Sequence, residues 1–134
     1  MSKRYKVKHI KLPFCVKVAN AYLGEQFNKV AEEFRELGSE NANLLNKINK
    51  ASKTNENKIT KNDIEKAFIE AFDISQAAQG YMWLLSNIYG KHFGFTFDNL
   101  FDKAIEKNAD RGYYGKDFNM ADWREKCEGR NCKK

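Results

Sequence analysis

Four acidic residues of this chain form two pairs with the same spacing. Glu33 and Glu36 lie in KVAEEFREL (29–37), and Glu70 and Asp73 lie in IEAFD (69–73). Residues three apart in a helix project from nearly the same side, so each pair presents its carboxylates together. Two like charges about 5 Å apart repel by on the order of 3 kcal/mol at an effective dielectric constant of about 20. If the two pairs face each other, protons, basic side chains or a divalent cation must neutralise them.

Each pair also has an ordinary explanation. Glu33 and Glu36 alone are typical of a solvated helix face. Glu70 and Asp73 are less ordinary because their surroundings are apolar, although a salt bridge to Lys66 or Arg35 is an alternative there. The occurrence of both pairs on two helices that pack together favours a cation. Carboxylate oxygens are the ligands that Mg²⁺ and Mn²⁺ prefer.

Two long helices must position these carboxylates. We expect one over 14–37, ended by Gly38, and one over 61–89, ended by Gly90. The second has apolar residues at nearly every angle, which predicts a buried helix. Its polar residues follow one line of three-residue steps: Glu70, Asp73, Gln76 and Gln79. The apolar stripe of the first helix consists of Val16, Ala19, Leu23, Phe27, Val30, Phe34 and Leu37.

The remaining elements are predicted from capping residues and glycines. Ser39 is suited to cap a short helix that turns Leu44, Leu45 and Ile48 to the core. Thr60 and Asp63 resemble a capping box. Thr96 or Asp98 can cap a helix with Leu100, Phe101, Ala104 and Ile105 inward and Gly112 beyond its end. We expect helices over 40–50, 97–110 and 120–127, a polar loop over 51–58, and a strand or an extended arm over 5–12. The fold class is therefore all-α, a bundle of four or five helices.

Size and composition fit one domain. The chain has 134 residues, 42% of them hydrophobic, and a formal net charge of +6. The positive charge lies at the ends, which suggests a basic arm over 1–13, a helical domain over 14–115 and a basic extension over 116–134. Three cysteines (Cys15, Cys127 and Cys132) and the lack of a signal peptide favour reduced thiols in a cytoplasm. No apolar run is long enough to span a bilayer.

The two acidic motifs resemble a known family. KVAEEFREL followed by IEAFDISQAAQGYMWLL is similar to the ExxE…ExxD signature of the MazG-like all-α nucleoside triphosphate pyrophosphohydrolases, and KNADRGYYG (107–115) is similar to a basic segment that follows in small, phage-type members. The resemblance covers about residues 14–115. The chain departs from the family in two ways. The gap between Glu36 and Glu70 is long, and EAFD replaces the more usual ELGD.

The resemblance implies Mg²⁺-dependent hydrolysis of a (d)NTP to (d)NMP and pyrophosphate. It implies Glu33, Glu36, Glu70 and Asp73 as metal ligands, with Glu36 and Glu33 also catalytic and Glu36 a candidate base. Lys107 and Arg111 share one helix face and are candidates to neutralise the triphosphate. Gln26, Lys29 and Asn87 are further candidates for substrate binding, and Trp83, Phe27 and Tyr22 for stacking. The family also implies a homodimer or homotetramer that completes the bundle.

Two other functions remain open. A basic helical protein that binds nucleic acid or acts as an inhibitor would explain the charged ends without catalysis. A phosphoribosyl-ATP pyrophosphohydrolase shares the carboxylate pattern, but the sequence around EAFD and RGYYG favours the phage-type enzyme. The sequence itself does not indicate the preferred base or sugar.

Overall fold

The structure is a computed structural model that describes residues 12–54 and 59–123, and every regular element within them is helical. The long helices are α1 (Leu23–Thr54), α2 (Lys61–Leu84) and α3 (Phe97–Asp110). The shorter elements are two 3₁₀ helices, η1 (Val16–Asn20) and η3 (Gly90–Phe93), and a π-helix, η2 (Leu85–Tyr89). Residues 120–123 are also helical. The predicted all-α class is confirmed. None of the described helices has the length and apolar character needed to cross a membrane.

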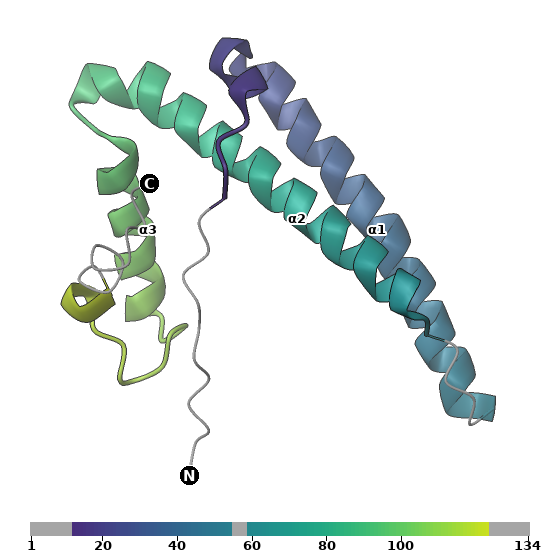
Figure 1. Ribbon diagram of the computed structural model, residues 1–134. Coiled ribbons are helices and arrows are strands. Elements are labelled where there is room, and N and C mark those ends of the chain that lie inside the picture. The colour runs from purple at the N-terminus through teal and green to yellow at the C-terminus, as the bar shows by residue number, and fades with distance from the viewer. Residues whose placement is uncertain (1–11, 55–58, 124–134) are drawn as a thin grey trace.

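The helices α1 and α2 form an antiparallel hairpin and lie side by side along most of their length (Figure 1). Two polar contacts fix their register. Near one end, the Gln26 side-chain amide donates to the Ala77 carbonyl oxygen over 2.9 Å. Near the other end, the Lys47 ammonium pairs with the Asp63 carboxylate at 2.8 Å. The predicted acidic residues lie between these two contacts along the hairpin.

The first long helix differs from the prediction at both ends. It begins at Leu23 rather than at residue 14, and the residues before it form η1. It continues through Gly38, so the predicted end there and the separate helix over 40–50 are wrong, and residues 51–54 are helical rather than a loop. A glycine inside a helix costs about 1 kcal/mol, which the packing of this long helix against α2 outweighs.

The start of α2 agrees with the sequence. Thr60 is the N-cap, its hydroxyl oxygen accepts a bond from the Asp63 N–H, and the Asp63 carboxylate accepts one from the Thr60 N–H, which confirms the predicted capping box. Lys47, and then the bond from the Thr60 N–H, hold the pKa of Asp63 well below its usual range. Asp63 therefore links the first turn of α2 to α1.

The predicted end of the second long helix at Gly90 is wrong. Gly90 continues the helical path into η3, and the chain turns at Gly94, whose φ of 75° lies in the left-handed region that favours glycine. Thr96 then caps α3 over the predicted range 97–110. Gly112, with φ 79°, lies beyond its end as expected. This last helix diverges from the hairpin (Figure 1).

The N-terminal segment lies against one flank of α2. The amides of Gln76 and Gln79 donate to the carbonyl oxygens of Pro13 and Leu12, each over 3.2 Å. The rings of Phe14 and Trp83 lie 5.0 Å apart. Two members of the predicted polar line on α2 therefore bind backbone of the N-terminal segment.

Few hydrophobic side chains are buried in a single copy of the described chain. Those that are buried are Val18, Ala77 and Leu84, whereas Phe68 on α2 is 71% exposed. The prediction of a helix buried all round is wrong here, because α1 and the N-terminal segment leave one side of α2 uncovered. Leu45, Ile48, Phe101 and Ala104, expected to face inward, are also exposed.

Some predictions lie partly or wholly outside the described residues. The strand or arm over 5–12 is one, except for Leu12, and Cys127 and Cys132 are others. Of the predicted helix over 120–127, the described residues 120–123 are helical.

Candidate metal centre

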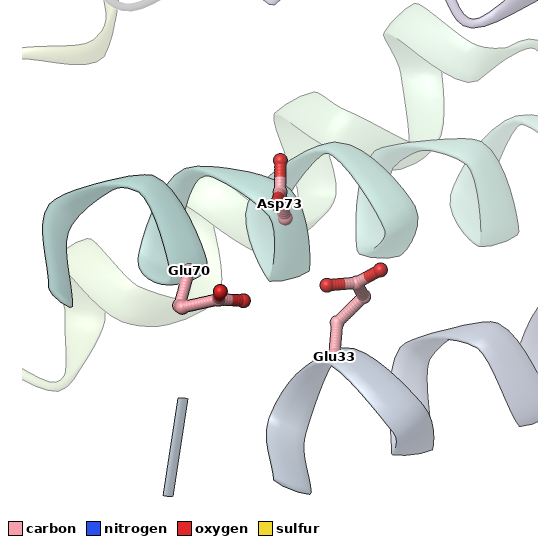
Figure 2. Close-up of side chains that lie close together, drawn as sticks. All are labelled: Glu33, Glu70 and Asp73. Atoms are coloured by element: carbon pink, nitrogen blue, oxygen red, sulfur yellow. The ribbon is translucent and has the colours of Figure 1, made fainter. Parts of the chain in front are cut away.

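The two acidic motifs meet at the α1–α2 interface. Glu33 extends from α1 toward α2, which carries Glu70 and Asp73, and the carboxylates of Glu33 and Glu70 point toward each other (Figure 2). One carboxylate oxygen from each of the three residues lies within 4.8 Å of the others. The structure therefore brings together three of the four predicted ligands from segments about forty residues apart in sequence.

These carboxylates are withdrawn from solvent. Glu33 is only 5% exposed, and Glu70 and Asp73 are half-buried. One oxygen of Glu33 and one of Glu70 are buried without a hydrogen-bond donor. Buried polar atoms are almost always paired in folded proteins, and a buried charge that lacks a partner is costly. The two oxygens therefore need a positively charged or hydrogen-bonding group between the helices.

Lys29 supplies part of the required positive charge. Its ammonium lies 2.5 Å from the Glu33 carboxylate, one turn along α1, and 3.9 Å from Glu32. The hydrogen bond to Glu33 raises the pKa of Lys29. A single ammonium cannot neutralise the three clustered carboxylates. It pairs with Oε1 of Glu33, so the buried Oε2 of Glu33 still lacks a hydrogen-bond donor. The donor set fits a divalent cation with oxygen ligands, such as Mg²⁺.

Glu36, the fourth predicted ligand, lies beside the cluster rather than within it. Its side chain is exposed. The negative charge of Glu33 is the main cause that raises the pKa of Glu36, and partial desolvation and the carboxylate of Glu70 add to it. Glu36 therefore interacts electrostatically with both motifs, but its oxygens are not among those that converge.

The predicted substrate residues are distributed over three elements. Lys29 contacts the acidic cluster directly, whereas Gln26 is buried and its amide N–H is used in the bond to α2. Asn87 lies in the π-helix η2, and Lys107 and Arg111 are exposed at the end of α3. In Figure 1, α3, at whose end these last two residues lie, diverges from the hairpin that carries the carboxylates.

The predicted stacking residues serve the packing or remain exposed. Trp83 contacts Phe14 of the N-terminal segment, and Phe27 lies 6.3 Å from Tyr81 between ring centres. Tyr22 is exposed.

Sequence reasoning missed the contacts that hold the centre in register. The bridge from Lys47 to Asp63 and the bond from Gln26 to Ala77 flank the carboxylates on either side. Gly80 adds a close approach, because a Cβ there would lie 2.8 Å from Val18 and 2.9 Å from the Gln26 amide. A signal for the first contact was available in the sequence, since Asn43 and Lys47 are polar residues one turn apart beside Leu44, which was predicted to face inward. In the structure, Asn43 also donates to Asp63 over 3.5 Å.

Comparison of the chain with models of protein families, with curated proteins and with solved structures found no match.

Proposed function

We propose that this protein is a Mg²⁺-dependent nucleotide pyrophosphohydrolase of the MazG-like type, which converts a (d)NTP to (d)NMP and pyrophosphate. One observation carries the proposal. Both acidic motifs supply carboxylates to one cluster, and two buried oxygens there lack any donor. A cation between the helices would satisfy these oxygens, and phosphate oxygens of a nucleotide commonly complete the coordination of Mg²⁺.

The residues of the centre would have two different roles, metal binding and proton transfer. Glu33, Glu70 and Asp73 would hold Mg²⁺, which when bound polarises a phosphate and lowers the pKa of a water molecule. Glu36 suits the role of proton acceptor, because it lies beside both motifs but outside the ligand cluster, so its carboxylate is not committed to the cation.

Binding of the triphosphate requires positive charge near the carboxylates. We assign this role first to Lys29, which is in contact with the centre and half exposed, so its ammonium can turn toward an anionic ligand. Lys107, Arg111 and Asn87 remain predicted substrate residues. Gln26 would act by holding the helices in register, since its amide is buried against α2.

Release of pyrophosphate from a panel of nucleotides tests the proposal. The panel includes the common (d)NTPs and phosphoribosyl-ATP, each with Mg²⁺ or Mn²⁺. We expect turnover of at least one (d)NTP and a loss of about 100-fold or more in Asp73→Asn, because the substitution removes a charged ligand. Asp98→Asn, the same change at an exposed position in the first turn of α3, should retain full activity. Circular dichroism of both variants checks that they fold.

No turnover across the panel with either cation would refute the proposal. Equal activity of Asp73→Asn and Asp98→Asn would refute the assigned centre. Salt-dependent binding of nucleic acid by an inactive protein would instead favour the alternative suggested by the basic ends of the sequence.

A further inference from the structure

The carboxylate cluster is paired with one positive charge of the chain itself. The Lys29 ammonium lies 2.5 Å from Oε1 of Glu33, the most buried of the three clustered carboxylates. Lys29 approaches from the solvent side, since its side chain is 51% exposed whereas that of Glu33 is 7% exposed. The pair therefore joins a buried carboxylate to a long and flexible side chain, which is able to leave it.

Lys29 has a second acidic partner within reach. Its ammonium also lies 3.9 Å from Oε2 of Glu32, whose side chain is 53% exposed. Glu32 and Glu33 follow Lys29 by three and four residues, the two spacings at which side chains of a helix meet. The lysine can therefore change partner by rotation about its side-chain bonds, between one position at the cluster and one beside solvent.

The net charge of the cluster decides how firmly Lys29 is held. Glu33, Glu70 and Asp73 each have a carboxylate oxygen within 4.8 Å of the others, so their three negative charges attract the ammonium together (Figure 2). With a divalent cation bound, only one negative charge of the cluster remains uncompensated. The ammonium is then attracted less, and it is also repelled by a charge of its own sign. Glu33 therefore holds Lys29 firmly without the cation and weakly with it.

We propose that Lys29 is an exchangeable counter-ion, which pairs with Glu33 in the cation-free protein and turns away from it when the cation binds. This inference rests on the proposed metal centre and adds a means of regulating it. Lys29 and the cation oppose each other at Glu33, so the lysine lowers the affinity of the centre for the cation. Since coupling between two bound charges is reciprocal, the cation loosens the lysine to the same degree.

The exchange links cation binding to phosphate binding. While Lys29 is paired with Glu33, its charge is used within the centre and the remaining carboxylates repel an anionic ligand. Once the lysine has turned away, its ammonium is available to a phosphate oxygen at the edge of the same centre. A first ligand that frees a group needed by the second gives positive cooperativity. The cation therefore binds before or together with the phosphates.

Titration of the nucleotide-free protein with Mn²⁺ at fixed pH, followed by electron paramagnetic resonance, tests the exchange without any reaction. Lys29→Met removes the ammonium and keeps an unbranched side chain. It should tighten Mn²⁺ binding by about 10-fold, since even in water a single and a double positive charge that share one carboxylate repel each other by roughly that factor. Lys29→Arg keeps the charge and should bind Mn²⁺ about as wild type does. Lys61→Met is the matched control, because Lys61 pairs with the exposed Glu65 at the same four-residue spacing.

The outcomes separate this inference from the proposed centre. If wild type binds Mn²⁺ and Lys29→Met binds it no more tightly, the exchange is overturned and the centre stands. If neither protein binds Mn²⁺, the centre itself is refuted and the exchange with it. Equal tightening by Lys29→Met and Lys61→Met would show only an effect of net charge and would also overturn the exchange.

Binding of inorganic tripolyphosphate tests the link to phosphate. At one free Mn²⁺ concentration that saturates both proteins, Lys29→Met should bind tripolyphosphate about 10-fold more weakly than wild type. The effect of Lys29→Met on the phosphate ligand is thus opposite in sign to its effect on the cation. Equal affinity of both proteins for tripolyphosphate would overturn the link.

Chemical labelling of the wild-type chain tests the exchange even if Lys29→Met does not fold. Lysines are acetylated with an N-hydroxysuccinimide ester, with and without saturating Mg²⁺, and the rate at each lysine is measured by mass spectrometry of peptides. Labelling of Lys29 should become several-fold faster with Mg²⁺, because the amine is no longer paired with a buried carboxylate. Lys61 is the internal control, and its rate should not change. An unchanged rate at Lys29 when the cation is bound would overturn the proposal.

Discussion

Removing one charge from the carboxylate cluster should stabilise the protein when no divalent cation is present. Glu70→Gln is the most informative change, because Glu70 has a buried oxygen without a donor and points toward Glu33. The new amide keeps the shape of the side chain and can donate a hydrogen bond to the orphaned oxygen of Glu33. Repulsion within the centre should therefore be replaced in part by a hydrogen bond.

The magnitude follows from the separations. At 4.8 Å, the largest distance within the cluster, two carboxylates repel by about 3 kcal/mol at an effective dielectric constant of about 20. Glu70 has two such neighbours. Partial exposure screens these interactions, and Lys29 already offsets part of the charge of Glu33. We expect a net gain of about 1 to 3 kcal/mol in the free energy of unfolding, or roughly 3 to 5 °C in Tm for each kcal/mol in a chain of this length.

The assay is urea unfolding in EDTA and again in excess Mg²⁺. Cation binding to the folded state stabilises it in proportion to the logarithm of the free cation concentration. Wild type should gain stability from Mg²⁺, and Glu70→Gln should gain much less. Glu65→Gln is the matched control on the same helix, because that carboxylate is exposed and lies near Lys61 instead. The reasoning is refuted if Glu70→Gln is less stable than wild type in EDTA, or if Mg²⁺ stabilises both proteins equally.

Two further predictions concern the helix hairpin. Gly80→Ala should lower the free energy of unfolding by about 1 to 3 kcal/mol, because its Cβ would overlap Val18 and Gln26. Gly38→Ala, whose Cβ would meet nothing within 4 Å, should raise the free energy of unfolding by about 0.5 to 1 kcal/mol. Urea unfolding measures both changes, and equal effects of the two substitutions would contradict the packing described at Gly80. Because the folded-state pKa of Asp63 is depressed, its contribution to stability is present above the ordinary aspartate pKa of about 4 and is lost as the pH falls through the folded value. Asp63→Asn should therefore be less stable than wild type at neutral pH, with a difference that narrows in acid; a difference independent of pH would contradict this assignment.

Local signals in the sequence predicted the local features of the fold. The capping box of Thr60 and Asp63 was identified correctly, because a cap depends on residues only three positions apart. Thr96 and Asp98 were the two predicted caps of α3, and the structure has Thr96. The convergence of the two acidic motifs was also predictable, since a three-residue spacing and an apolar helix stripe fix which sides meet. Glu36 falls outside the cluster because its position depends on the crossing of two helices, which spacing within one helix does not determine.

The ends of helices at glycines and the burial of α2 were predicted less well. Gly38 and Gly90 both continue helical structure, whereas Gly94 has the left-handed conformation that turns the chain. A glycine ends a helix only when tertiary packing does not continue it, and the sequence around a single glycine does not contain that information. The open face of α2 was likewise not predictable, because an apolar pattern does not indicate which side chains of a helix the rest of its own chain will cover.

Six residues of α2 recur at alternating steps of four and three and form a mostly apolar stripe: Ile64, Phe68, Ala71, Ser75, Ala78 and Met82. The π-helical turn over Leu85–Tyr89 ends this stripe. The four-and-three spacing from Ile64 to Met82 would otherwise continue through Leu85 and Tyr89. A π-turn contains about one residue more than an α-turn, so side chains beyond it are rotated by about 100° from the line of the stripe. One extra residue thus ends the stripe, and an insertion or deletion within this turn would rotate the residues that follow it without altering the part of α2 that carries the carboxylates.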